Sequence, residues 1–409
     1  MRYTGRSSGA GATVVLVRVD LVTKEYPPEI YGGAGVHVAE LVKALRQHIE
    51  VQVRAFGAPR AEPDVASYAV PAELAAANAS LQTLGTDLAI AQDVAGADLV
   101  HTHTWYANGA GRLAQLLHGI PHVLTAHSLE PLRPWKSEQL GGGYRVSSWI
   151  EREAYATADA VIAVSAGMRR DILRAYPFVA PERVAVIHNG IDLEKWQPRR
   201  DPAVLAAHGI DPDRPSVVFV GRITRQKGLP YLLAAARELA PDVQLVFCAG
   251  APDTPEIMAE VQAGVAALRE TRTGVVWIEE HLPVAELSAV LAAATVFVCP
   301  SIYEPLGIVN LEAMACEAAV VATATGGIPE VVEDGATGRL VPIEQAQDGT
   351  GTPLAPETFV ADLARTLNEV LADPAAARRM GEAGRRRAAE RFSWTAIGDA
   401  TRALYASLV

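Results

Sequence analysis

Short apolar runs alternate with helical stretches along almost the whole of this 409-residue chain. In the first half, the strand-like runs are at 19–23, 51–56, 98–105, 122–128, 160–165 and 183–190. The pattern restarts at SVVFVGR (216–222) and continues to AAVVAT (318–323). Because parallel strands need crossover helices between them, this alternation predicts an α/β fold with a doubly wound parallel sheet in each half.

The segment 192–215 separates the two halves, since it is rich in Pro, Asp and Arg and holds no strand-like run. A chain of this length can build two hydrophobic cores. We therefore expect a linker here and two α/β domains, over residues 17–197 and 198–392. Residues 393–409 are expected to form a C-terminal helix, and the Gly- and Ser-containing residues 1–16 a disordered N-terminal extension.

One segment of the second half, residues 299–327, gives the strongest indication of function. From 299 to 327 the chain runs strand, loop, helix, strand, and the helix is predicted to begin near Ile308. Loops at the carboxyl ends of parallel strands hold ligands, and a helix N-terminus attracts anions. Glu304 and Glu312 lie on either side of this helix start, which suits a ligand that carries both phosphate and hydroxyl groups. A Glu in a first helical turn is also ordinary dipole complementation, so the pair alone does not decide.

Two further loops have a similar form. Gly32 and Gly33 follow a strand and precede a helix, where glycine lets the backbone approach a phosphate or sugar; a tight turn for helix packing is the alternative. Arg222 ends a strand, and Lys227 stands just before another helix. Two cations at a helix N-terminus repel each other and the dipole unless an anion lies between them, although a solvated turn would also contain them.

Polar residues end several strand-like runs of the first half. His103 and His127 follow two of them, and His188 and Asn189 follow a third. A single His is more often a structural residue. Parallel strands end at one edge of a sheet, however, so these side chains are expected to line one crevice.

Composition and charge exclude several classes of function. A net charge of −11 argues against a general nucleic-acid surface, although a local basic pocket for one anionic ligand remains. Cys248, Cys299 and Cys316 lie in or beside apolar runs without metal-ligand spacing, so we expect buried thiols, no metal and a cytoplasmic protein. The longest uncharged run is too short to span a bilayer, and no membrane association is expected.

Six segments together resemble one enzyme family. They are TKEYPPEIYGGAGVHV, VHTHTWYANGAG, TAHSLEPLRPWKSEQLGGGY, VIHNGID, VGRITRQKGL and SIYEPLGIVNLEAMACE. They are similar to the family-4 retaining glycosyltransferases of the GT-B fold, and more narrowly to the actinobacterial-type glycogen synthases, a group that includes α-maltose-1-phosphate synthases. The resemblance extends from about Val17 to the C-terminus. It implies two Rossmann-like domains facing across a cleft, with the C-terminal helix crossing back to the first domain.

The resemblance also assigns residues to a donor site. It implies that Arg222 and Lys227 hold the diphosphate of a nucleotide sugar, that Glu304 and His127 contact the transferred glucose, and that Glu312 binds the ribose. The remaining donor-binding residues that it implies are Gly32, Gly33, Leu282, Gly307, Ile308 and Val309. In such an enzyme the nucleotide sugar is a substrate, and neither a cofactor nor a metal is expected.

The segment HSLEPLRPWKSEQLGGGYR (127–145) indicates the kind of acceptor, because it combines the cations Arg133, Lys136 and Arg145 with the aromatic residues Trp135 and Tyr144. Cations suit the phosphate of a small sugar and an aromatic suits its ring face, whereas a neutral glucan needs no cations. We therefore expect glucose 1-phosphate as the preferred acceptor, giving α-maltose 1-phosphate, with extension of an α-1,4-glucan secondary. The expected acceptor-binding residues are His103, Trp105, Arg133, Lys136, Tyr144, Arg145 and Asn189.

Several alternatives stay open. The acceptor segment would be a surface loop if its cations pair with Glu130 and Glu138. An oxidoreductase would need G-x-G-x-x-G after a strand, a spacing that the loop at Gly32 lacks. A plain glycogen synthase, a GT-B epimerase or a non-catalytic binder of sugar nucleotides would share the fold, but the binder should lack Glu304 or a cation. The donor base is open, with ADP-glucose favoured over UDP-glucose, as is the oligomeric state, with a homodimer among the options.

Overall fold

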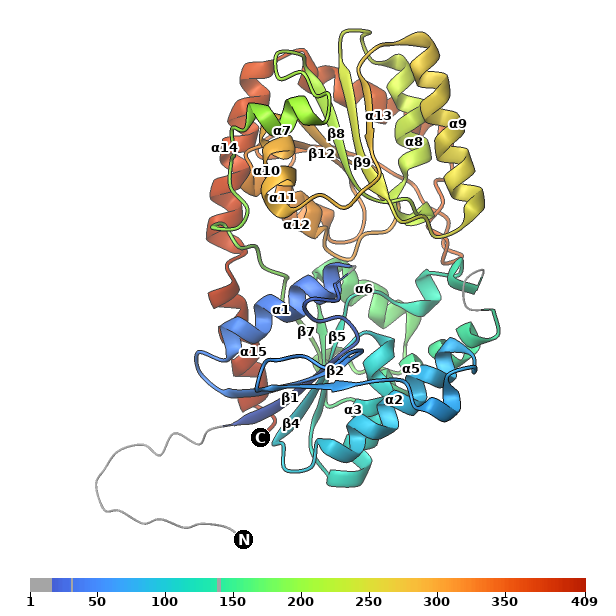
Figure 1. The fold of residues 1–409 in the computed structure, drawn as a ribbon, viewed down its shortest axis with the longest axis vertical. Coiled ribbons are helices and arrows are strands. Elements are labelled where there is room, and N and C mark those ends of the chain that lie inside the picture. The colour runs from blue at the N-terminus through green and yellow to red at the C-terminus, as the bar shows by residue number, and fades with distance from the viewer. Residues whose placement is uncertain (1–16, 31, 138–140) are drawn as a thin grey trace, which may run out of the picture.

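Two parallel β-sheets lie one above the other along the long axis of the molecule (Figure 1). The computed structural model describes residues 17–30, 32–137 and 141–409. The extension expected over residues 1–16 lies outside the described residues. All pairs of neighbouring strands in both sheets are parallel, which confirms the predicted α/β fold class.

The first sheet has seven strands. Their bounds are β1 (Arg18–Thr23), β2 (Glu50–Phe56), β3 (Val65–Tyr68), β4 (Leu99–His103), β5 (His122–Ala126), β6 (Ala160–Ala163) and β7 (Val184–Val186). They lie in the order β3-β2-β1-β4-β5-β6-β7, so the chain winds outward from β1 in both directions. The switch between β1 and β4 opens a crevice at the carboxyl ends of these strands.

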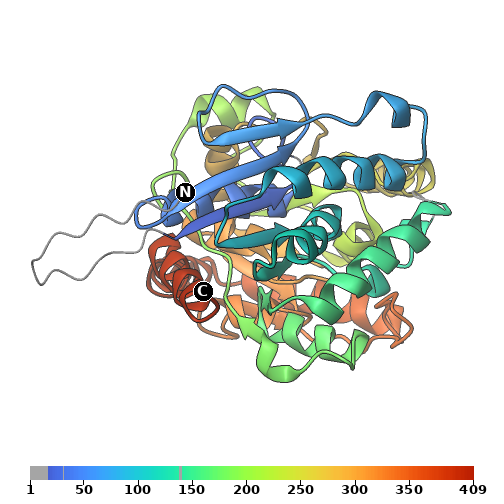
Figure 2. The same ribbon diagram turned by 90° about the horizontal axis from the view of Figure 1, so that it is seen from below.

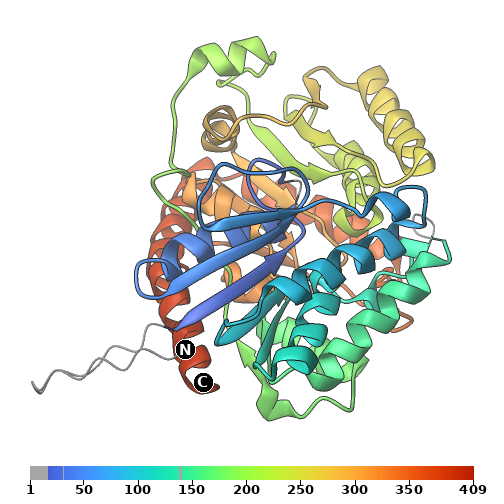
Figure 3. The same ribbon diagram turned by 60° about the horizontal axis from the view of Figure 1, so that its bottom comes forward.

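Helices cover both faces of the first sheet (Figures 2 and 3). They are α1 (Gly33–Leu45), α2 (Ala79–Asp93), α3 (Trp105–His118), α5 (Gly143–Thr157) and α6 (Ala166–Ala175), with the 3₁₀ turns η1 (Ala72–Leu74), η2 (Glu130–Leu132) and η3 (Pro181–Arg183). Successive strand residues point to opposite faces. Leu21 therefore packs in one core with Leu41 of α1, while Val22 packs in another with Ile90 of α2.

The second sheet is built in the same way. Its strands are β8 (Ser216–Arg222), β9 (Gln244–Gly250), β10 (Val275–Ile278), β11 (Val296–Cys299), β12 (Ala319–Thr323) and β13 (Gly338–Val341), in the order β10-β9-β8-β11-β12-β13. Its helices are α7 (Pro202–Ala207), α8 (Leu229–Ala235), α9 (Pro255–Thr271), α10 (Val284–Ala293), α11 (Ile308–Ala315), α12 (Ile328–Val331), α13 (Pro356–Leu371) and α14 (Pro374–Arg391), with the 3₁₀ turns η4 (Arg225–Lys227) and η5 (Ala236–Glu238). Residues of α8, α9 and α13 join the core on one face, and those of α10 and α11 the core on the other. Within the described part of the chain, no helix combines the length and apolar character needed to cross a membrane.

The chain passes between the two sheets twice. The first passage includes the segment expected as a linker, in which α7 packs against α10 of the second sheet. In the second passage α14 leads into α15 (Trp394–Ala406), which packs against α1 of the first sheet. The Ile191 N–H donates to the Phe392 carbonyl at 2.8 Å, so the two passages are hydrogen-bonded to each other. The predicted return of the C-terminal helix to the first domain is confirmed.

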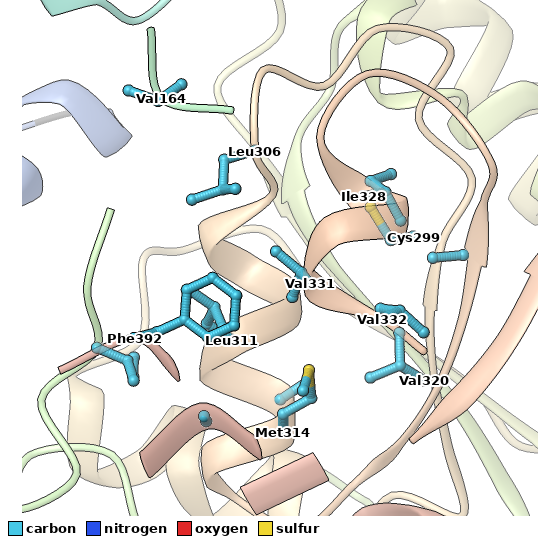
Figure 4. Packing of buried hydrophobic residues seen from close by; sticks show 14 of the residues in the cluster. Val164, Cys299, Leu306, Leu311, Met314, Val320, Ile328, Val331, Val332 and Phe392 are labelled. Carbon is cyan, nitrogen blue, oxygen red and sulfur yellow. The ribbon is translucent and has the colours of Figure 1, made fainter. Parts of the chain in front are cut away.

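Apolar and polar contacts join the facing edges of the two domains. Val164, directly after β6, belongs to one hydrophobic cluster with Leu306 and Ile328 of the second domain (Figure 4). Next to it, Ser165 Oγ donates to the Pro305 carbonyl at 2.6 Å. The loop that precedes α11 is thus held against the first domain by both kinds of contact.

Glu330 on α12 ties the N-terminus of α6 to the second domain. Its carboxylate accepts from the N–H groups of Ala166 and Gly167 at 2.9 Å each and lies 3.0 Å from His188 Nε2. Burial raises the pKa of Glu330, but the hydrogen bonds from His188 and the two amides outweigh it, so the pKa lies below its ordinary value. A helix N-terminus favours the ionised carboxylate in the same direction.

We predict that Glu330→Gln destabilises the protein at neutral pH by roughly 1–2 kcal/mol, because charge-assisted hydrogen bonds are lost. Glu330 has a depressed pKa in the folded state. Its stabilisation is therefore full above the pKa of Glu in the unfolded chain and is lost as the pH falls through the folded pKa. Thermal unfolding of both proteins should show a difference in melting temperature that shrinks below about pH 4.

The matched control is Glu333→Gln, which removes an exposed partner of Arg387 and should change stability less. An equal effect of the two substitutions at neutral pH would contradict the role given to Glu330.

Candidate active site

Glu304 lies in the loop between β11 and α11. It is 7% exposed, and its carboxylate accepts hydrogen bonds from Lys227 Nζ at 2.7 Å and Ser301 Oγ at 3.2 Å. Gly326, in the loop after β12, packs against Glu304: its φ is +56°, and its backbone lies so close to the Glu304 carbonyl that a Cβ would collide. The Gly327 N–H donates to the same carbonyl at 3.0 Å. The neighbouring backbone therefore fixes the main chain of Glu304, and Lys227 and Ser301 hold its carboxylate.

Lys227 reaches Glu304 from η4, directly after β8. Gly228 follows with a φ of +66°, and its contact with the Pro300 carbonyl leaves no room for a Cβ. Burial lowers the pKa of Lys227, but the Glu304 carboxylate outweighs it, so the pKa lies above its ordinary value. Lys227 is thus a charged ammonium group in a largely enclosed site.

Arg222, the last residue of β8, pairs with Asp253 at 3.1 Å. We expected two neighbouring cations to need a bound anion between them. In the structure Arg222 and Lys227 each have a carboxylate partner within the chain, and these partners balance the repulsion. The attraction for an external anion must therefore come in part from the neighbouring helix N-termini.

Two such helix N-termini meet here. α11 begins at Ile308 and Val309, after Gly307, and α1 of the first domain begins at Gly33. They lie close together, because a Cβ built on Gly33 would be 3.3 Å from Ile308 Cδ1. Neither N-cap residue, Gly32 or Gly307, supplies a side-chain cap, although the Glu25 carboxylate accepts from the Gly32 N–H. Uncapped amides and two positive dipole ends form a site that suits an anion.

Two other expected donor-binding residues have different surroundings. The Gly32 N–H donates to Glu25 Oε2 at 2.8 Å, so this amide has a partner within the first domain. Leu282, between β10 and α10, is 5% exposed and packs in the hydrophobic core. Because its side chain is part of that core, a ligand would contact Leu282 through the backbone.

Glu312, on the second turn of α11, lines a small cavity between the domains together with Glu40, Lys195 and Trp394. Burial raises its pKa to about 7, against the opposing charge of Lys195. A carboxyl group that is partly protonated at neutral pH can both donate to and accept from hydroxyl groups.

Three histidines of the first domain meet at the carboxyl edge of its sheet. His103 ends β4 and His127 follows β5, with His103 Nδ1 and His127 Nε2 3.0 Å apart. His37 of α1 contacts both rings, at centroid distances of 5.4 and 4.7 Å. Burial lowers the pKa of all three, to about 4 for His37, so the imidazoles are neutral at pH 7. His37 was not among the expected site residues, because its position in GVHVAEL fits an amphipathic helix.

Part of the expected acceptor segment comes close to Arg222 of the second domain. Burial lowers the pKa of Lys136, and the charges of Arg133 and Arg222 lower it further against that of Asp253, to about 8. Arg133 Nη1 donates to Ser128 Oγ at 3.1 Å. Its Nε is buried without a hydrogen-bond partner among the described residues. Positive charge from both domains therefore converges on one place, where Asp253 offsets part of it.

The other expected acceptor residues differ in exposure. Trp105, at the start of α3, and Asn189, after β7, are each 4% exposed. Tyr144 of α5 is partly buried, and its hydroxyl donates to a carbonyl of η2 at 2.6 Å. Arg145, the next residue, is exposed.

Buried carboxyl groups support the acceptor segment from within the domain. Glu151 of α5 accepts from the Glu130 N–H at 2.8 Å and from Tyr176 Oη at 2.5 Å, and Glu130 accepts from Ser147 Oγ at 2.5 Å. Burial, together with the charge of Glu130, raises the pKa of Glu151 to about 8. Glu130 is therefore held inside the domain, while Glu138, the other expected partner of the cations, lies outside the described residues.

Comparison with known proteins finds relatives over nearly the whole chain. Two family models match, glycosyltransferase family 4 over residues 31–195 and glycosyl transferases group 1 over residues 202–387. The α-maltose-1-phosphate synthase of Mycolicibacterium smegmatis is 57% identical over 95% of this chain and 99% of that protein. A glycogen synthase of Mycobacterium tuberculosis is 31% identical over 95% and 94% of the two chains. The structure of sucrose-phosphate synthase from Thermosynechococcus elongatus matches with a TM-score of 0.75 and 25% identity, over 96% and 99% of the chains.

We predict that Glu312→Gln makes the ligand-free protein more stable above pH 7. A carboxyl group whose pKa is raised on folding stabilises the fold at low pH, and this contribution is lost as the pH rises from the unfolded value through about 7. The variant avoids this loss, so it should gain roughly 1–3 kcal/mol at pH 8 and little near pH 4.

Urea unfolding at both pH values measures the effect, with Glu270→Gln, an exposed position on α9, as the matched control. Equal stability of wild type and Glu312→Gln at pH 8 would rule out a raised pKa for Glu312.

Proposed function

Because this chain belongs to the family-4 glycosyltransferases and is a hexosyltransferase, we propose that it transfers glucose from a nucleotide-glucose to glucose 1-phosphate. The product is α-maltose 1-phosphate, the favoured donor is ADP-glucose, and extension of an α-1,4-glucan is a secondary activity. Identity of 57% to an α-maltose-1-phosphate synthase over nearly the full length of both chains supports this reaction.

The geometry of the second domain supports the donor half of the proposal. Arg222 ends β8 and Lys227 follows it in η4, and Lys227 pairs with Glu304 in the loop before α11, so a diphosphate on the helix amides would meet both cations. Phosphate oxygens would then share Lys227 with Glu304. The ribose would lie at Glu312, and the base against the backbone at Leu282.

The proposed reaction needs no side-chain nucleophile. The bond between glucose C1 and the phosphate oxygen of the donor breaks, and a bond from C1 to the acceptor hydroxyl oxygen forms on the same face. The proton of that hydroxyl passes to the leaving phosphate. The sugar passes through an oxocarbenium-like state while negative charge develops on the diphosphate, which Lys227, Arg222 and the helix amides are arranged to stabilise. Glu304 and the neutral imidazole of His127 would hold the glucose hydroxyls.

One observation carries the acceptor half of the proposal: Lys136 and Arg133 of the first domain share their surroundings with Arg222 of the second. Burial and the charges of Arg133 and Arg222 disfavour the ammonium form of Lys136 more than Asp253 and Glu130 favour it, and a bound phosphate would favour it further. A phosphorylated acceptor therefore relieves an electrostatic cost that a neutral glucan would leave in place.

A second activity, glucan extension, is favoured by Trp135 and Tyr144 in the same segment, since aromatic faces bind sugar rings. A product assay crosses ADP-glucose and UDP-glucose with glucose 1-phosphate and glycogen. We expect maltose 1-phosphate as the main product with ADP-glucose. Extension of glycogen without use of glucose 1-phosphate would overturn the proposed acceptor, and incubation with donor alone tests for epimerisation.

We predict that Lys227→Ala and Glu304→Ala each lower kcat by at least about 10–100-fold, because a charge-assisted contact in the site contributes roughly 1.5–3 kcal/mol. Steady-state assays at saturating donor and acceptor measure the loss, and circular dichroism checks the fold. Arg225→Ala, an exposed cation in the same turn, is the matched control and should stay near wild-type activity. Near-normal turnover in either variant would remove that residue from the site.

We predict that Lys136→Ala raises the KM for glucose 1-phosphate by about 10-fold or more without a similar change for glycogen. In the wild type, this KM should rise as the pH passes through about 8, since Lys136 then loses its proton. Lys136→Arg keeps its charge and should flatten that rise.

Initial rates from pH 7 to 9 measure these changes, and Arg133→Ala should resemble Lys136→Ala. Arg152→Ala, exposed on α5, is the matched control. Equal losses for the two acceptors would contradict a phosphate pocket.

A further inference from the structure

The imidazoles of His37, His103 and His127 come from three separate elements and converge in the first domain. One ring nitrogen of each lies within 4.8 Å of the others. Among the residues that the structure describes, no other group of three His, Cys, Asp or Glu side chains has this arrangement. The sequence does not indicate it, because the three residues are 66 and 24 positions apart, from 37 to 103 and from 103 to 127.

The distances suit shared coordination. His103 Nδ1 and His127 Nε2 are 3.0 Å apart. Two nitrogens bound to one tetrahedral Zn²⁺ at 2.0–2.1 Å lie roughly 3.4 Å apart, so this pair would separate only slightly and give up the hydrogen bond between the two rings. Neither nitrogen of His37, nor Nε2 of His103, has a hydrogen-bond partner among the described residues. The Asn189 side chain lies near His37 and raises the pKa of the imidazole, but by less than burial lowers it.

The neighbouring His101 does not belong to this group, because both of its ring nitrogens have other partners. Its two ring nitrogens lie 2.6 Å from Tyr405 Oη and 2.7 Å from Thr125 Oγ1, so both are occupied. His127 is partly exposed while His37 is buried, so a cation can enter beside His127.

We propose that His37, His103 and His127 form a binding site for one divalent transition-metal cation of the zinc type. Imidazole nitrogens suit Zn²⁺, whereas Mg²⁺ and Ca²⁺ prefer oxygen ligands. Three ligands leave a fourth coordination position for water. Because His127 is expected at the transferred glucose, the bound cation would inhibit the transferase; this consequence rests on the proposed function, but the binding site itself does not.

Calorimetric titration of untagged, chelator-treated protein with Zn²⁺ tests the site, with Mg²⁺ as the negative control. We expect one Zn²⁺ per chain in the wild type and in His48→Gln, an exposed position just beyond α1. His37→Gln should bind at least about 100-fold more weakly, since even the loss of an outer-shell partner costs 10–100-fold. Equal affinity in the three proteins, or no saturable binding by the wild type, would overturn the proposal.

X-ray absorption on the wild-type 1:1 complex provides a test that does not depend on the folding of a variant. We expect three imidazole nitrogens at about 2.0–2.1 Å, and a sulfur ligand would assign the ion to a cysteine and overturn the site. In transferase assays, Zn²⁺ should inhibit and a chelator should restore the rate. Binding at the three histidines without inhibition would overturn the inhibitory consequence alone.

Discussion

The ion pair between Lys227 and Glu304 joins the carboxyl ends of β8 and β11, and the rest of the donor site is arranged around it. Taking two charges out of water is costly, so such a pair is a weak source of stability. Its value lies in position, because Gly228 follows Lys227 and Gly326 packs against the Glu304 carbonyl, each with a positive φ that other residues rarely adopt. Both charges can also exchange partners. A diphosphate would pair with the Lys227 ammonium group, and sugar hydroxyls would donate to the Glu304 carboxylate. Neither charge need be left unpaired when the substrate binds.

The first domain must supply the other side of this site. Its contacts with the second domain hold it in that position. Val164 and Ser165 pack against the loop before α11, and Glu330 holds the N-terminus of α6. The two passages of the chain are hydrogen-bonded at Ile191 and Phe392. Opening the cleft would break the contacts at the loop and at α6. This connectivity allows the domains to rotate about the two paired passages. A hinge of this kind needs only a few residues to change their backbone dihedral angles.

The fold was largely predictable from the sequence because strand and helix periods are local properties. Two short strands, β3 and β13, were missed, since each has four residues at an edge of its sheet and no long apolar run. The site was less predictable. Asp253, the partner of Arg222, is 31 residues further along the chain, and no local pattern indicates that pairing. His37 reads as one position of an amphipathic helix, and only the packing of α1 over the strand ends brings it to His103 and His127.

The convergence of Lys136, Arg133 and Arg222 is unusual in a chain with a net charge of −11, and the buried carboxyls behind it help to explain it. Glu151 has a pKa of about 8 and so holds a proton at neutral pH. The buried pair of Glu130 and Glu151 therefore carries less negative charge than two ionised carboxylates would. The carboxyl groups behind the loop therefore offset its positive charge only in part. A phosphate in the cleft would meet that charge directly, whereas a neutral sugar would gain little from it.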